Sequence, residues 1–187
     1  MGKIRLFLSL VPSSEEIEAL KEDQETFKKG FSPDNLRWED PEKFHLTLRF
    51  LGDIDEIKAE ALTGTLDRLK FDFESIKFET DKIGFFPEGK YPNVIYAGLK
   101  EIGNNSEVLV GFIDKIIYNF GVKPDKRFIP HITLGRFNRN KRTKITEPLN
   151  YSIQKYKIEF ESFCLMQSRL TPAGSVYDLL NKFNFRK

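Results

Sequence analysis

The chain has 187 residues, enough for one domain or two closely packed lobes, and its 40% hydrophobic and 31% charged content is typical of a soluble globular protein. Its single cysteine, Cys164, excludes an intramolecular disulfide and a multi-cysteine metal site, and its apolar neighbours indicate a buried thiol. No apolar run is long enough for a membrane span and no signal peptide is evident, so we expect a cytoplasmic monomer of one domain, residues 1–187, that makes no contact with membranes.

The net charge of +2 hides an uneven distribution of charged residues. Residues 14–60 hold 14 acidic against 7 basic residues, whereas residues 121–146 hold 8 basic residues and one acid, Asp125. A run of like charges is most often a solvated face. The position of the basic run around a histidine motif, described below, favours a phosphate-binding patch.

The first half of the chain reads as a strand, a helix and a second strand. Residues 3–11 alternate in part between apolar and polar, as in a strand with one core face. Ser13 and Glu16 have the spacing of a capping box, and Gly30 is a plausible end for the helix that follows. Residues 44–51 alternate cleanly and predict the second strand.

The second half continues as a mixture of helices and strands. Asp53 and Glu56 have capping-box spacing again, and residues 84–89 are rich enough in turn residues to predict a loop. The expected elements are a helix over about 54–70, strands over 72–79 and 93–99, a helix over 105–120, a strand beginning at His131, and strands within 152–185. This order predicts an α+β protein with largely antiparallel sheets.

Both histidines of the chain stand in the same four-residue pattern. One copy is His45-Leu46-Thr47-Leu48 and the other is His131-Ile132-Thr133-Leu134. From the frequencies of Thr and Leu in this chain, the doubled pattern arises by chance roughly once in 40,000 sequences. A lone histidine in a strand is more often structural, but the matched pair favours a functional role.

The doubled pattern is suited to acid–base chemistry at phosphorus. A strand places residues i and i+2 on one face, about 6.5–7 Å apart, so each motif offers an imidazole beside a hydroxyl. One neutral and one protonated imidazole supply a base for attacking water and an acid for a leaving oxygen. The hydroxyls of Thr47 and Thr133 can donate hydrogen bonds to the other phosphoryl oxygens.

Such a displacement needs a cation near the phosphoryl group, and two arginines are candidates. Alternation places Arg49 on the face of His45, with Leu46, Leu48 and Phe50 turned to the core. Arg136 falls on the wrong face by strict alternation, so its strand must end or twist at Gly135 for it to reach. Gly135, having no side chain, would also let a phosphate approach the backbone.

Other readings of the histidines have less support. A two-histidine metal site lacks a third protein ligand at a sensible spacing, and hydroxyls are poor ligands, so we expect no metal. A serine nucleophile with histidine as its base has no supporting motif in this chain.

The two motifs, with Arg49-Phe50-Leu51-Gly52 after the first and Gly135-Arg136 after the second, resemble the two-histidine phosphoesterase superfamily. Within it, the chain is most similar to the RNA 2′,3′-cyclic phosphodiesterase family, also called the 2′-5′ RNA ligase family. The resemblance covers nearly the whole chain and includes the segments 5–10, 91–99 and 168–177, which are individually weak signals.

The resemblance implies a bilobal fold of two mainly antiparallel β-sheets flanked by helices, with the active site in a cleft between the lobes. It implies metal-independent, cofactor-free hydrolysis of a terminal RNA 2′,3′-cyclic phosphate to a 2′-phosphate. His45 would protonate the departing 3′ oxygen and His131 would activate water, a division that the near-symmetric sequence does not itself distinguish. Thr47, Thr133 and Arg136 would bind the phosphate.

The expected partner is therefore an RNA end that carries a 2′,3′-cyclic phosphate. A basic rim would bind its phosphates, formed by Lys126, Arg127, Arg139, Lys141, Arg142 and Lys144. Phe85 and Phe86 either stack on a base or pack in the core. Three alternatives stay open: ligation by the reverse reaction, hydrolysis of a small cyclic nucleotide, and non-catalytic binding of RNA ends.

Overall fold

The structure, a computed structural model, describes residues 2–31, 35–72, 74–124, 127–138, 141, 143–145, 153–172 and 174–186. Its elements are β1 Lys3–Leu10, α1 Ser14–Lys28, β2 Leu36–Trp38, the 3-10 turn η1 Pro41–Lys43, β3 Leu46–Asp55, α2 Glu56–Asp67, β4 Ile76–Phe86, β5 Val94–Ile102, α3 Asn105–Tyr118, β6 His131–Phe137, β7 Lys157–Phe160, β8 Ser162–Thr171 and β9 Gly174–Asn184. No helix in this described part is long and apolar enough to cross a membrane.

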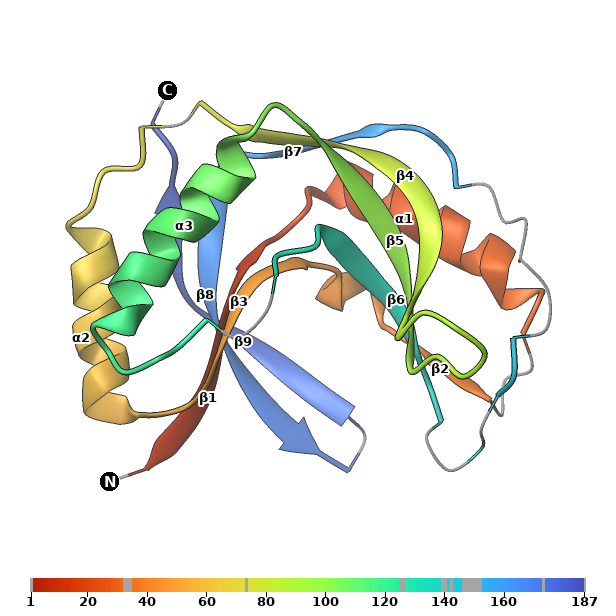
Figure 1. Ribbon diagram of the computed structural model, residues 1–187, viewed down its shortest axis with the longest axis horizontal. Helices are drawn as coiled ribbons and strands as arrows, with labels where there is room; N and C mark the ends of the chain where they lie inside the picture. Colours follow the sequence, from red (N-terminus) through yellow and green to blue (C-terminus); the bar gives the residue numbers. More distant parts are fainter. Residues whose placement is uncertain are drawn as a thin grey trace.

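Within the described residues the strands form one curled sheet of nine strands in the order β7-β4-β5-β6-β3-β1-β8-β9, with β2 paired to β6 (Figure 1). Each described strand pair is antiparallel, which confirms the α+β class. The expectation of two sheets needs correction, because β3 and β6 lie side by side and join the halves through the pair Leu46 and Ile132. The expected lobes are thus two halves of one sheet.

Each half of the sheet is covered by a helix that follows strands of the other half. The side-chain amide of Gln24 on α1 donates to the carbonyls of Glu39 and Leu134, at 2.7 and 2.9 Å, and so ties α1 to the β6 side. Helix α3 packs beside α2 on the β3 side (Figure 1), where Asp114 accepts hydrogen bonds from Arg49. This exchange fastens the halves together around one continuous buried core.

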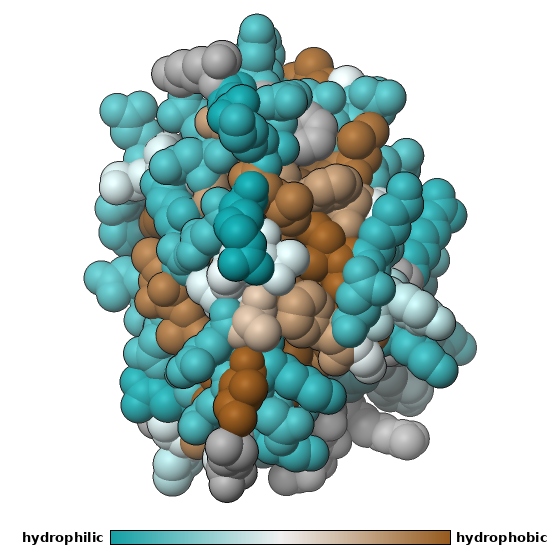
Figure 2. Space-filling view, turned by 90° about the vertical axis from the view of Figure 1, so that its left-hand side faces the viewer, coloured by the Kyte–Doolittle hydropathy of each residue, from teal (hydrophilic) through white to brown (hydrophobic). Residues whose placement is uncertain are grey.

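The outer faces of α2 and α3 keep some apolar side chains in solvent. Ile57 on α2 and Val108 and Phe112 on α3 are exposed. Figure 2, which views the molecule from the α2 and α3 side, shows apolar surface near the middle of that face with polar side chains around it. Cys164, in contrast, is buried, as the sequence predicts.

The two capping-box predictions have different outcomes. In α1 the box is present: the Ser13 hydroxyl accepts from the Glu16 amide, and the Glu16 carboxylate accepts from the Ser13 amide. The second is wrong because β3 continues to Asp55, which caps α2 without a side-chain hydrogen bond. Asp53 instead accepts two hydrogen bonds from Arg5 on the neighbouring strand, at 2.9 and 3.1 Å.

The loop predicted from residue 84 is also wrong in its first half, since β4 runs to Phe86. Gly84 lies opposite Tyr96 in the sheet, and a Cβ at this position would overlap the Tyr96 ring. The glycine therefore provides space for a cross-strand aromatic ring and does not mark a turn.

Candidate active site

The two histidine motifs lie on adjacent antiparallel strands at the centre of the sheet. Leu46 of β3 pairs with Ile132 of β6. The same antiparallel register sets His45 across from Thr133 and Thr47 across from His131, with all four residues on one face. Diagonal neighbours on such a face are about 7–8 Å apart, so the two imidazoles belong to one small site.

The two imidazoles are held in the same way by the backbone. Nδ1 of His45 lies 2.7 Å from the carbonyl oxygen of Lys43, and Nδ1 of His131 lies 2.7 Å from that of Ile129. Because a carbonyl only accepts, Nδ1 carries the hydrogen in each ring and Nε2 is left with a lone pair. Each ring therefore has the tautomer in which Nε2 can take up a proton.

Aromatic rings enclose both histidines. His45 lies 5.0 Å from the ring of Phe7 and 5.3 Å from that of Tyr177. His131 lies 5.2 Å from the ring of Tyr96 and 5.0 Å from that of Phe86, which itself stacks on Tyr96. These contacts fix the ring planes and remove water from around the imidazoles.

This enclosure lowers the pKa of both histidines. The pKa of His45 is lowered to about 4, mainly by burial and to a lesser extent by the charges of Arg136 and His131, against the raising effect of the Lys43 carbonyl. Burial and the charge of Arg136 also lower the pKa of His131, which the Ile129 carbonyl partly opposes. Both rings are consequently neutral at pH 7 in the free protein, and Arg136 is close enough to act on both.

A β-bulge brings Arg136 onto the histidine face. Tyr96 pairs with Thr133 and Ile95 with Gly135, so Leu134 has no partner on β5 and the alternation of β6 is reset. The irregularity that the sequence required near Gly135 is therefore present. Gly135 itself is buried, and a Cβ there would come within 3.2 Å of Trp38 and Ile95, so its small size serves packing and not the approach of a phosphate.

A bulge at the matching position of β3 overturns the expectation for Arg49. Thr47 pairs with Ser9 and Arg49 with Leu8, so Leu48 is skipped. Arg49 consequently turns to α3, where it donates to both carboxylate oxygens of Asp114 at 2.6 and 2.8 Å. It is a structural ion pair and not a cation of the histidine face.

The same bulge corrects the prediction that Phe50 packs in the core. Phe50 is 71% exposed, and its ring lies 6.1 Å from that of Phe7, the neighbour of His45. Phe50 therefore occupies the place on β3 that Arg136 occupies on β6.

Two residues of the site carry no sequence signal that alternation can detect. Glu39 lies 3.5 Å from Arg136 and is mostly buried, and the hydroxyl of Tyr177 accepts a hydrogen bond from the same guanidinium. Glu39 precedes η1 and Tyr177 lies on β9, so only the fold brings them to Arg136. They hold the arginine in place beside the histidines.

The remaining candidates divide between the site and other regions. The hydroxyls of Thr47 and Thr133 form no hydrogen bond to any described residue, so both are available to a ligand. Phe85 packs against Phe137 and the core, whereas Phe86 contacts His131.

Of the basic rim, Arg127, Lys141 and Lys144 are exposed, and Lys126, Arg139 and Arg142 lie outside the described residues. Across the described ranges, no group of three His, Cys, Asp or Glu side chains is arranged to hold a metal ion.

Comparison with known proteins places these features in a family. The family model described as "LigT like Phosphoesterase" matches residues 11–96 and 99–177. The RNA 2′,3′-cyclic phosphodiesterase of Methanocaldococcus jannaschii is 31% identical over 189 residues, covering 96% of this chain and 100% of the relative. That of Archaeoglobus fulgidus is 33% identical over 145 residues, covering 77% and 81%.

A solved structure shares the fold over almost the full length. The crystal structure of TT0787, a protein of Thermus thermophilus, superposes with a TM-score of 0.76 at 28% identity and covers 97% of this chain and 98% of its own. The match to the family model and the similarity to the Methanocaldococcus relative extend over most of the chain. The protein therefore belongs to the LigT-like phosphoesterase family.

Proposed function

We propose that this protein hydrolyses the 2′,3′-cyclic phosphate at the end of an RNA strand and leaves a 2′-phosphate, without a metal or a cofactor. The observation that carries the proposal is the pair of imidazoles on one face, each tied through Nδ1–H to a backbone carbonyl at 2.7 Å. Relatives that span the whole chain are named RNA 2′,3′-cyclic phosphodiesterase, which supports the choice of substrate.

In this mechanism Nε2 of His131 takes a proton from water as the water oxygen attacks phosphorus. The bond from phosphorus to the 3′ oxygen breaks, and that oxygen receives a proton from Nε2 of His45. Thr47 and Thr133 donate hydrogen bonds to the non-bridging oxygens, and Arg136 balances their growing negative charge. The assignment of acid and base follows the family resemblance.

Because the pKa of His45 is low in the free protein, we propose that the bound substrate favours protonation of this general acid. In the free protein the pKa of His45 is about 4, so the ring is mostly neutral at pH 7. A bound phosphodiester anion favours the protonated ring and raises that pKa, whereas Arg136 opposes protonation of both histidines. Binding of the anion and protonation of His45 are thus coupled.

We further propose that residues 1–187 act as one domain, as a monomer in the cytoplasm, on RNA ends. The continuous core and the exchanged helices support a single domain. We propose that the same site can also join a 2′,3′-cyclic end to a 5′-hydroxyl, because this hydroxyl can attack phosphorus in place of water, which forms a 2′-5′ bond and releases the 3′ oxygen to be protonated by His45.

The direct test is turnover of an RNA oligomer with a 2′,3′-cyclic end by the purified protein in EDTA, followed by phosphorus NMR. The expected product is a 2′-monophosphate, formed at a rate that EDTA does not change. Absence of turnover, or a 3′-phosphate product, would contradict the proposal. Comparison with a cyclic mononucleotide shows how much the rest of the strand contributes.

A further inference from the structure

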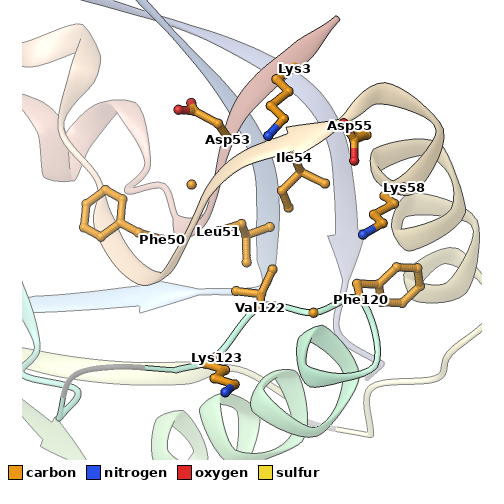
Figure 3. Close-up of a pocket in the computed structure, with 12 residues that line it drawn as sticks. Lys3, Phe50, Leu51, Asp53, Ile54, Asp55, Lys58, Phe120, Val122 and Lys123 are labelled. Carbon is orange, nitrogen blue, oxygen red and sulfur yellow. The ribbon is translucent and has the colours of Figure 1, made fainter. Parts of the chain in front are cut away.

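A cavity of about 500 Å³, lined in part by Phe50, has no part in the mechanism above (Figure 3). Its walls are the far end of β3, the first residue of β1, the start of α2 and the segment that follows α3. Lysines from three of these segments line it: Lys3, Lys58 and Lys123. We call it the lysine cavity.

The charge around the lysine cavity is positive and poorly compensated. None of its three lysines forms an ion pair with a described residue. Of the two acids that line it, Asp53 is bonded to Arg5 and also lies within the field of Lys3, so two acids face the three lysines and Arg5. Figure 3 shows Lys3 and Lys58 on one side of the cavity and Lys123 on the other. Cations gathered at one concave surface attract anions.

Strand β3 leads from the histidine motif to the lysine cavity. It runs from Leu46, next to His45, through Phe50 to Asp55, and its residues from Phe50 to Asp55 line the cavity. An RNA strand that follows β3 away from the histidines would reach the cavity.

Phe50 stands at the border between the histidine face and the lysine cavity. It lines the cavity, its ring lies 6.1 Å from that of Phe7, and Phe7 lies 5.0 Å from His45. A phenyl ring that is 71% exposed gains little burial from the fold, but it offers a flat face to a base.

We propose that the lysine cavity binds the phosphodiester backbone of the RNA strand on the 5′ side of the cyclic phosphate, with Phe50 stacking on a base at its entrance. This inference rests on the proposed function and adds the direction in which the strand leaves the site. The competing route passes the basic rim, of which Arg127, Lys141 and Lys144 are described and exposed.

The two routes are separated by matched triple substitutions. One variant carries Lys3→Gln, Lys58→Gln and Lys123→Gln, and the other carries Arg127→Gln, Lys141→Gln and Lys144→Gln. The readout is kcat/KM for a cyclic-ended oligomer divided by kcat/KM for the cyclic mononucleotide. We expect the lysine-cavity variant to lower this ratio roughly tenfold, because it removes three exposed charges of modest energy each. Its salt dependence should weaken by about 0.7 in slope for each phosphate that is no longer neutralised.

Substitution of Phe50 tests the stacking. We expect Phe50→Ala to lower the same ratio by about 5-fold to 100-fold, the range for loss of one stacked base, and Phe50→Trp to keep it. Tyr118→Ala is the matched control, since Tyr118 is a 63% exposed aromatic that does not line the cavity.

Different outcomes contradict the proposed RNA subsite and the proposed hydrolysis of the cyclic phosphate. If the wild type does not open the cyclic mononucleotide, the proposed function fails. If it does, the lysine cavity is excluded as the RNA subsite by a wild-type ratio near one, by an equal fall in both triple variants, or by a fall in the rim variant alone.

Discussion

The two halves of the candidate site share a backbone arrangement and differ in the charge of the residue that lies five positions after each histidine. In each half a histidine is tied by Nδ1 to a carbonyl, a threonine follows two residues later, and a leucine is skipped in a bulge. The next residue on the histidine face is Phe50 in one half and Arg136 in the other. A near-symmetric frame thus carries an apolar side and a cationic side, which suits a substrate with a base at one end and a phosphate at the other.

Replacement of either histidine by alanine should have the largest effect. We expect His45→Ala and His131→Ala each to lower kcat on a cyclic phosphate by about 10²–10⁴-fold, the range for loss of one general acid or base. Circular dichroism and thermal melting check that both variants fold. Full activity in either variant would remove the proposed mechanism.

A substrate with sulfur in place of the 3′ oxygen assigns the two roles. A thiolate leaves without a proton, so this substrate should restore much of the rate to His45→Ala and little to His131→Ala. The opposite pattern would exchange the acid and the base between the halves.

The two arginines should separate catalysis from stability. We expect Arg136→Met to lower kcat/KM by roughly 10²-fold, as for loss of one group that stabilises developing charge. Arg49→Met should leave the rate within a few-fold and lower the free energy of unfolding by about 1–3 kcal/mol, because it leaves the partly buried Asp114 without its partner. If Arg49→Met lost activity without losing stability, Arg49 would have a role in the active site and not a structural one.

The sequence was sufficient to predict the α+β class and the placement of each histidine and its threonine on one face of a strand, because a repeated pattern and strand alternation are local properties. It failed at Arg49 and Phe50, because the bulge at Leu48 is defined by pairing with Leu8 and Ser9, some 40 positions earlier. Glu39 and Tyr177 could not be predicted either, since tertiary contacts alone bring them to Arg136.

The pH dependence of kcat/KM should shift with the charge at position 136. In the free protein the base is neutral above the pKa of His131 and the acid is protonated below the pKa of His45, and both values lie under 6.5. The profile should therefore be a bell with its maximum on the acidic side of that value. Arg136→Met removes a charge that lowers both pKa values, so both limbs should move to higher pH, whereas Arg136→Lys should hold them. If both limbs of the pH profile were unchanged in Arg136→Met, the charge of Arg136 would not affect the pKa values of the histidines.

The smallest expected effect is on the pH dependence of the free energy of unfolding, which compares the two histidines. Each folded-state pKa lies below the unfolded value of about 6.5, so the neutral rings stabilise the fold above that pH and this stability is lost as the pH falls toward the folded pKa. For His45, with its pKa near 4, the loss should be on the order of 1–3 kcal/mol between pH 6.5 and 4. Urea unfolding at pH 7 and pH 4.5 should show less acid destabilisation in His45→Gln than in the wild type. An equal pH dependence in the two proteins would mean that His45 is not held neutral by its surroundings. A larger effect in His131→Gln than in His45→Gln would place the more enclosed imidazole in the other half of the site.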